Sequence, residues 1–407
     1  MLPQSFVRWR PASRASGDVG VAQSRIEFAN TLRGIAAISV LLSHYFGVFW
    51  LQHPTAAVLV NGDPIPADEL MAPRYVIWIN TLPQINWGAY GVALFFIISG
   101  FVIPFSLTRT TRSGFVVNRF FRLAPTYAAG FTVTLGALAL SSRHFDNPWP
   151  YSPMQIAVHY VPGIRDLLWF PNIDGIIWTL EVEVKFYFVC WLLLPGFKRS
   201  SRLVLGVPFL LVVMGLLASR LLIAGDPAQG PVFIGLYNIS LSTPMLTFMF
   251  IGVVFHYMYR EHVTVRVGWA AIIVFFALFL LQFKSSVVGT QFPTSWSYGL
   301  AVLTFSCAYL WPHRLGSNPV SDFFASISYP LYVVHGIMGY AILLASSWAG
   351  LRPIWALLTA TATAVVVALV LHTVVELPAQ RLGRSLAGRL ASTEARNPSH
   401  TLTPPVA

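Results

Sequence analysis

Residues 86–106, NWGAYGVALFFIISGFVIPFS, form a run of 21 residues without a charged side chain. A helix needs about 20 residues to cross about 30 Å of hydrocarbon, so this stretch predicts a membrane span. Apolar runs of similar length occur on both sides of it. We therefore predict an all-α, polytopic membrane protein with a bundle of about ten transmembrane helices, near residues 30–50, 86–106, 121–141, 176–196, 203–224, 234–256, 267–283, 295–312, 323–346 and 354–376.

The composition of the whole chain agrees with this class. Of the 407 residues, 56% are hydrophobic and only 10% are charged, whereas a soluble domain carries about 25% charged residues. So much apolar side chain excludes an ordinary cytosolic domain and a disordered chain. The two cysteines, Cys190 and Cys307, fall inside apolar runs, which excludes a disulfide framework and a thiolate zinc site.

The basic residues predict the orientation. The chain has 26 Lys and Arg against 15 Asp and Glu, and the basic residues gather in short clusters between the spans. With the N-terminus inside, 19 of these residues fall on the inner side and five or six on the outer side. This asymmetry follows the positive-inside rule, so we predict that both termini are cytoplasmic. The same clustering argues against a nucleic-acid partner.

The chain divides into three predicted regions. Residues 1–25 form a basic cytoplasmic tail without the apolar core of a signal peptide, and residues 26–380 form the transmembrane domain. Residues 381–407 form a cytoplasmic tail that we predict to be disordered, because it is rich in Ser, Thr and Pro from about residue 392. Residues 153–170 are apolar but interrupted, and we predict an interfacial or re-entrant segment there.

Ionisable residues inside predicted spans are functional candidates because each is expensive to insert. Arg33 and His44 are 11 residues apart in the first span, almost three helical turns, so they share a face with His44 roughly 16 Å deeper. An imidazole titrates near neutrality and suits a proton acceptor working on a hydroxyl. The alternative is a histidine that only bonds a neighbouring helix.

Arg119 and Arg122 follow the second span and lie one helical turn apart. Two guanidiniums on one face suit phosphate oxygens, which each can hold bidentately. By spacing alone, a basic cytoplasmic segment that only fixes the topology is the favoured interpretation.

The fourth span contains two acids with different surroundings. Glu181 and Lys185 stand at i and i+4 in the favourable order, so we predict a structural pair on one helix face. Glu183 points elsewhere and has no cation on its own helix, so it must be protonated, hydrogen-bonded or matched from another helix. Glu183 is therefore the functional candidate of the two.

Two further histidines lie in the last spans. His335 is predicted near mid-membrane with Tyr332 one turn earlier, and it fits either a functional or a packed, hydrogen-bonding role. His372 and Glu376 stand at i and i+4 and predict a local pair.

Six short motifs now appear in a fixed order: LRGIAAISVLLSH (32–44), GVALFFIISGFVI (91–103), NRFFRLAPTY (118–127), WTLEVEVKFYF (178–188), ISYPLYVVH (327–335) and ELP (376–378). Over about residues 26–380 the chain resembles the acyltransferase-3 family of membrane acyltransferases, which acylate sugars of bacterial surface polysaccharides and related hydroxylated acceptors. The first motif matches the family's Arg, ten residues, His signature, and the third carries its Arg-x-x-Arg.

The resemblance implies roles for these residues. Arg33, His44 and Glu183 would be catalytic, and Arg119 and Arg122 would contact the phosphates of a cytoplasmic acyl-CoA. Candidate substrate-lining residues are Trp178, Tyr332 and His335. The chain departs from the family's usual pattern at Asn30, Thr31, Ala93, Val184 and Lys185, which bears on acceptor specificity.

We therefore expect a multi-pass O-acyltransferase of the bacterial inner membrane. It would transfer an acyl group, acetyl in our prediction, from acyl-CoA to a hydroxyl of an envelope glycan or lipid-linked sugar. Its partners would be acetyl-CoA, the acceptor and membrane lipids, with no metal, no permanently bound cofactor and no nucleic acid. The rival class is a secondary transporter or flippase, which also needs charges at membrane depth but usually shows inverted repeats; the sequence has none.

Overall fold

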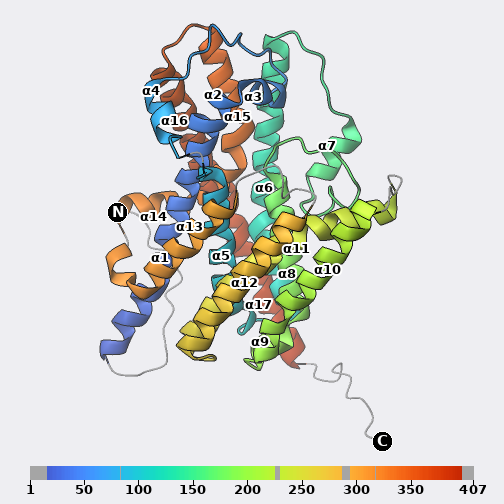
Figure 1. Cartoon of the computed structure of the whole chain (residues 1–407), viewed down its shortest axis with the longest axis vertical. Coiled ribbons are helices and arrows are strands. Elements are labelled where there is room, and N and C mark those ends of the chain that lie inside the picture. The colour runs from blue at the N-terminus through green and yellow to red at the C-terminus, as the bar shows by residue number, and fades with distance from the viewer. Residues whose placement is uncertain (1–15, 83, 225–229, 287–293, 317, 397–407) are drawn as a thin grey trace, which may run out of the picture.

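The computed structural model describes residues 16–82, 84–224, 230–286, 294–316 and 318–396. Over these ranges the chain is helical and contains no strand. The long helices form one bundle (Figure 1), with α2, α3 and α4 near one end and α9 and α17 near the other. This confirms the predicted all-α membrane architecture; most of the predicted tail 1–25 lies outside the described residues, although helix α1 already begins at Ser16.

Eight helices of the described chain are long and apolar enough to cross a membrane. Each contains a long, mostly uncharged run of hydrophobic residues. Such a run is stable in lipid as a helix, because a helix satisfies the backbone N–H and C=O groups within the segment. The helices that carry these spans are α1 (Ser16–Leu42) continued by η1 (Ser43–Val48) and α2 (Phe49–Leu51), α5 (Trp87–Leu107), α6 (Arg112–His144), α10 (Val207–Ala224) preceded by η2 (Arg202–Gly206), α11 (Pro231–Tyr259), α12 (Val265–Ser285), α15 (Ser328–Trp348), and α16 (Pro353–Leu371) continued by η4 (His372–Glu376) and α17 (Leu377–Arg396).

The other two predicted spans are present as shorter helices. Helix α8 (Ile177–Leu192) has 16 residues and α13 (Thr294–Leu310) has 17, so each is only about 24–26 Å long at 1.5 Å per residue. Helix α8 ends at Leu192, and the short α9 (Leu194–Lys198) begins after Leu193. The count of ten spans and the cytoplasmic termini therefore remain predictions.

Two element boundaries differ from the sequence prediction. The expected span 323–346 is divided, because α14 (Pro319–Ser326) ends before Ile327 and α15 begins after it. Helix α17 runs to Arg396, so residues 381–396 of the predicted disordered tail are helical; residues 397–407 lie outside the described residues.

The remaining described elements are short. They cap the ends of the bundle or connect its helices, and comprise α3 (His53–Leu59), α4 (Arg74–Ile79), α7 (Pro153–His159) and η3 (Pro312–Leu315).

Glycine allows α5 to lie in the centre of the bundle. A Cβ added at Gly100 would stand 1.9 Å from the carbonyl oxygen of Met249, and one added at Gly252 would stand 2.1 Å from that of Ile97. The backbones of α5 and α11 therefore touch, as small residues permit in membrane interfaces. On the α1 side, a Cβ at Gly91 would stand 2.6 Å from the carbonyl oxygen of Ala36. This packing brings α1, α5 and α8 close enough to share a cavity.

Candidate active site

A cavity of about 80 Å³ lies where five helices meet. It brings together four of the residues predicted from the sequence, although they come from distant parts of the chain. Its lining comprises Arg33 of α1; Val92, Phe95, Phe96 and Ser99 of α5; Arg122 and Leu123 of α6; Thr179, Leu180 and Glu183 of α8; and Ser328, Tyr329 and Tyr332 of α15.

The cavity carries two guanidiniums and one carboxylate. Glu183 accepts hydrogen bonds through Oε1 from the Tyr187 hydroxyl at 2.5 Å and from Ser99 Oγ at 3.4 Å. Within the described chain, neither Arg33 nor Arg122 has a carboxylate oxygen within 4.0 Å. An excess of positive charge in a largely buried cavity favours a bound anion, because such a charge is costly without a partner.

Arg119 does not line this cavity. Its guanidinium donates to Ser106 Oγ at 2.5 Å and lies 5.2 Å from the ring centroids of Phe115 and Tyr187. Its Nε is buried and has no hydrogen-bond partner. The two arginines expected to act together therefore lie in different places: Arg122 on the cavity and Arg119 in a neighbouring groove.

His44 and His335 form a second cluster beside the cavity. Their ring centroids are 4.7 Å apart, and the ring of Tyr340 stacks on His44 at 5.6 Å. His44 lies in the π-helical turn η1, a local widening of the helix that often occurs at functional sites.

The two histidines keep ring nitrogens without partners. His335 donates its Nδ1 proton to the carbonyl oxygens of Leu331 and Tyr332 at 3.0 and 2.9 Å, so its Nε2 is the basic nitrogen. That Nε2 and the Nδ1 of His44 are both buried without a hydrogen-bond partner. Unpaired buried nitrogens are rare and costly, so these two are candidates for binding a substrate.

Tyr332 connects the histidines to the cavity. It lines the cavity, its ring lies 5.8 Å from that of His335, and its hydroxyl shares a hydrogen bond of 2.8 Å with Thr179 Oγ1. Of the predicted substrate-lining residues, Tyr332 lines the cavity and His335 lies next to it. Trp178 packs partly buried against the core and is not among the lining residues.

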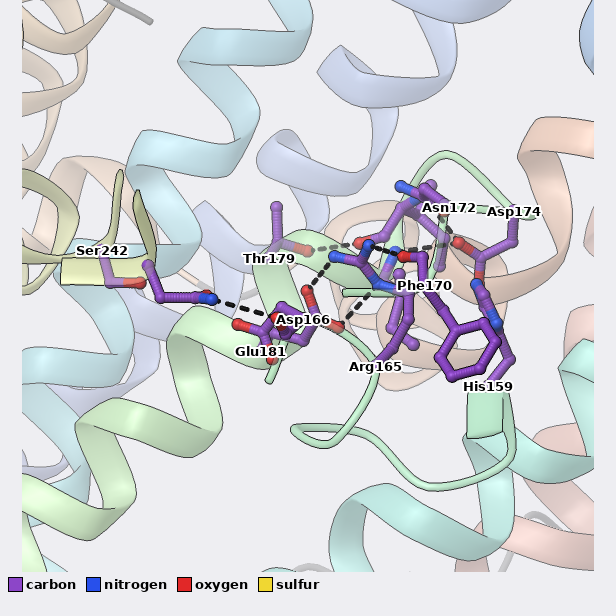
Figure 2. Close-up of polar contacts among 12 residues, drawn as sticks. His159, Arg165, Asp166, Phe170, Asn172, Asp174, Thr179, Glu181 and Ser242 are labelled. Atoms are coloured by element: carbon purple, nitrogen blue, oxygen red, sulfur yellow. Dashed lines mark hydrogen bonds and ion pairs between the residues drawn. The ribbon is translucent and has the colours of Figure 1, made fainter. Parts of the chain in front are cut away.

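The predicted ion pair between Glu181 and Lys185 is wrong. Glu181 makes a bidentate bond with Arg165, Nε to Oε1 at 2.8 Å and Nη2 to Oε2 at 2.6 Å, as Figure 2 shows. Lys185 instead pairs with Asp166 and also donates to Ser242 Oγ at 2.9 Å. The loop before α8 offers better geometry than a contact along one helix, because Arg presents two parallel donors to a carboxylate.

The α7 segment, residues 153–174, contains no helix long enough to span a membrane. Helix α7 has seven residues, and the chain then turns back into the bundle. Asp174 accepts the Tyr127 hydroxyl at 2.7 Å and the backbone N–H groups of Ile176 and Ile177, so it caps the start of α8. This segment therefore fixes the helix that carries Glu183.

Both ring nitrogens of His159 are bonded within the α7 segment. Its Nδ1–H donates to the carbonyl oxygen of Gln155 at 2.9 Å, and its Nε2 accepts the N–H of Ile173 at 3.1 Å. Desolvation lowers the pKa of this imidazole below its usual 6.5, so the neutral form is favoured.

Sequence reasoning did not single out Tyr187, Ser99 and Tyr329. Tyr187 carried a usable signal, because it stands four residues after Glu183 on the same helix and such pairs are neighbours. Ser99 and Tyr329 lie within apolar stretches and are recognisable only once the helices are assembled.

Other predicted pairs and sites have a simpler outcome. His372 Nδ1 and Glu376 Oε2 are 2.7 Å apart, which confirms the predicted pair. Among the described residues, no group of three or more His, Cys, Asp or Glu side chains is arranged to hold a metal ion.

Comparison with known proteins gives one match. A family model described as an acyltransferase domain covers residues 26–373, nearly the whole of the helical bundle and all of the residues of the cavity and the histidine cluster. No curated protein and no solved structure matches the chain significantly.

Proposed function

Because the chain belongs to the acyltransferase-3 family and is a multi-pass membrane acyltransferase, we propose that it moves an acyl group, acetyl, from cytoplasmic acetyl-CoA to a hydroxyl of a bacterial envelope glycan or lipid-linked sugar. The family match favours transfer chemistry over the transporter alternative. The observation that carries the proposal is the pairing of a cationic cavity with two adjacent histidines whose ring nitrogens are unpartnered.

The cavity would receive the donor. Arg122, with Arg33 beside it, would hold the phosphates of coenzyme A, since guanidiniums without carboxylate partners suit phosphate oxygens. The long pantetheine arm separates these phosphates from the thioester, so the cations and the base need not be adjacent. We leave Arg119 out of the donor site because its guanidinium lies in a separate groove.

His44 would act as the general base. Its free ring nitrogen takes the proton of the acceptor hydroxyl as the oxygen attacks the thioester carbonyl, a new C–O bond forms and the C–S bond breaks. The proton on His44 can then pass to the departing thiolate, so that free CoA and an O-acyl ester are the products. A neutral imidazole suits this step because its unprotonated ring nitrogen can accept a proton.

Glu183 would complete the site. It lines the cavity with Arg33 and Arg122, and the hydroxyls of Ser99 and Tyr187 fix its position. We propose that it offsets the positive charge of the arginines and orients the donor toward His44. His335 and Tyr332 would position His44 and the acceptor.

Purified protein in lipid nanodiscs tests the proposal directly. Acetyl-CoA and extracted envelope glycans are supplied, and both CoA release and the mass of the glycans are followed. We expect acceptor-dependent CoA release and one acetyl increment on a glycan hydroxyl, both absent in His44→Ala. Release from acyl-CoA that no hydroxylated acceptor stimulates, or transfer to amino groups alone, would contradict the assignment.

A further inference from the structure

A second, larger recess lies on the outside of the bundle between α6, α8 and the end of the α7 segment. This groove has a volume of about 610 Å³ and is almost entirely apolar. Its lining comprises Phe115, Val116, Arg119, Phe120, Leu123, Ala124, Pro125 and Ala128 of α6; Tyr160, Val161 and Pro162 after α7; and Val184, Tyr187, Phe188 and Trp191 of α8.

The groove faces the lipid and has the length of a hydrocarbon chain. Phe120 and Phe188 on its two edges are 56% and 59% exposed. From Phe115 to Ala128 the groove follows 13 residues of α6, about 20 Å at 1.5 Å per residue. Gly163, at φ +93°, turns the chain directly over α8, where an added Cβ would stand 2.9 Å from Val184 Cγ1. The loop therefore closes one end of the groove.

The opposite end carries positive charge. Arg119 is the one ionised side chain lining the groove, and its buried Nε has no partner. Arg112, at the start of α6, lies 5.3 Å over the ring of Trp191, an aromatic typical of the membrane interface. No acidic residue lines the groove, so an apolar chain that ends in an anion is the complementary ligand.

The groove and the cavity share a wall. Leu123 lines both, and Tyr187 lines the groove while its hydroxyl binds Glu183 of the cavity. A headgroup held at Arg119 therefore lies next to the cavity that we assign to the donor. A phospholipid offers the same chain and phosphate, but only a lipid that carries the acceptor would also place a hydroxyl beside the cavity.

We propose that this groove binds the hydrocarbon chain of a phosphate-bearing, lipid-linked sugar, with the phosphate at Arg119 and Arg112 and the sugar beside the cavity. The assignment rests on the proposed function, because it makes the groove the acceptor site of that reaction. It selects a lipid-linked sugar over a finished, lipid-free glycan as the acceptor.

Photolabelling in nanodiscs measures binding without any turnover. The probe is a long-chain polyisoprenyl phosphate with a diazirine on its chain, and labelled peptides are mapped by mass spectrometry. We expect labelling of α6 and α8, reduced about tenfold by Ala124→Phe, which fills the middle of the groove. The matched control is Ala270→Phe, on the exposed side of α12, which should label as the wild type does. Equal labelling of both variants would overturn the proposal.

The charge of the groove gives an independent test. Arg119→Gln should lower labelling by the phosphate probe about tenfold, Arg119→Lys should retain part of it, and Arg266→Gln on α12 should have no effect. A neutral polyisoprenol probe should be indifferent to all three. Displacement of the phosphate probe by palmitoyl-CoA, or equally well by phosphatidylglycerol, would overturn the proposal in favour of a donor-chain site or a general lipid site.

Acyl transfer separates this inference from the proposed function. Ala124→Phe should keep transfer to a short soluble glycoside and lose about tenfold in transfer to a lipid-linked sugar. Groove labelling in a protein that transfers nothing to either acceptor would contradict the proposed function. Transfer to both acceptors at unchanged rates in Ala124→Phe would contradict the lipid site alone.

Discussion

His159 in the α7 segment and His335 at the candidate site begin with the same bond and end differently. Each donates its Nδ1 proton to the carbonyl oxygen four residues earlier. The Nε2 of His159 then accepts the N–H of Ile173, and His53 repeats this arrangement with Ile65. The Nε2 of His335 accepts nothing. In the first region the ring closes a loop; in the second, one nitrogen is left free.

The acids of α8 repeat the contrast. Glu181 is held by both nitrogens of a guanidinium, while Glu183, two residues later, meets only hydroxyls on the wall of a cavity with two arginines. A buried polar group left without its partner costs about 1–3 kcal/mol. In the α7 segment, His159 and Arg165 are fully bonded and hold the fold, whereas the candidate site keeps ring nitrogens and guanidiniums available for a ligand.

The largest expected effect comes from His44. Its replacement in His44→Ala should lower acyl transfer by about 10²–10⁴-fold, the usual contribution of a positioned general base, with little loss of thermal stability. His159→Gln serves as the matched control, which should keep transfer and lose stability. Near-normal acyl transfer by purified His44→Ala would contradict the catalytic role of His44 and with it the contrast to the structural His159.

Breaking the ion pair between Arg165 and Glu181 should have the largest effect on stability. Arg165→Gln leaves the buried Glu181 carboxylate uncompensated and should cost about 3–5 kcal/mol of stability, measured as a lower melting temperature in detergent. Because Lys185 pairs with Asp166, exchanging Glu181 and Lys185 should not restore the stability that is lost when Glu181 is replaced. Recovery of stability in that double variant would instead support the ion pair between Glu181 and Lys185 that the sequence predicted.

The arginines sharpen the comparison within α6. Arg122→Ala should raise the KM for acyl-CoA about tenfold, and Lys should rescue it only partly because an ammonium lacks the bidentate fork. Arg119→Ala should leave this KM almost unchanged, since its guanidinium lies outside the cavity. Equal rises in both variants would return the two residues to one donor site, as the family resemblance implied.

The smallest effect is a pH dependence of the loops. Desolvation lowers the pKa of His159 and of His53 below 6.5, so the folded loops hold neutral rings. Their stabilisation is complete above about pH 6.5, the unfolded value, and is lost as the pH falls below it, when the open state gains the proton.

Hydrogen exchange can measure this loss. After correction for the intrinsic rate, amides near Ile65 and Ile173 should open more often at about pH 5.5 than at about pH 7.5. The replacement His159→Gln should remove the pH dependence near Ile173 only. If these amides opened equally often at both pH values in the wild type, the two rings would not be acting as hydrogen-bond acceptors that hold the loops.

The fold class could be predicted from the sequence because membrane insertion demands long uncharged runs, and such runs are visible without contacts. The number of spans could not, since α8 and α13 are apolar but short. The break at Ile327 between α14 and α15 likewise left no mark in the apolar pattern.

At the site, the sequence motifs predicted the residues better than their partners. Arg33, Arg122, Glu183 and Tyr332 were all singled out, and all line the cavity. The pairing of Glu181 was missed because an i, i+4 rule considers one helix only, while Arg165 comes from the preceding loop. The contact of His44 with His335 joins residues that are far apart in the sequence, and it is recognisable only once the helices are assembled.

The two acids of α8 provide the most direct test of the claim that polar groups without a charged partner mark the reaction site. Glu181→Gln and Glu183→Gln change the same charge on the same helix, so melting temperature and acyl transfer are measured for both in one preparation. We predict that Glu183→Gln stays folded and loses about tenfold or more in transfer, while Glu181→Gln stays active per folded molecule and melts earlier. Normal turnover by Glu183→Gln, or a stable and inactive Glu181→Gln, would contradict the account.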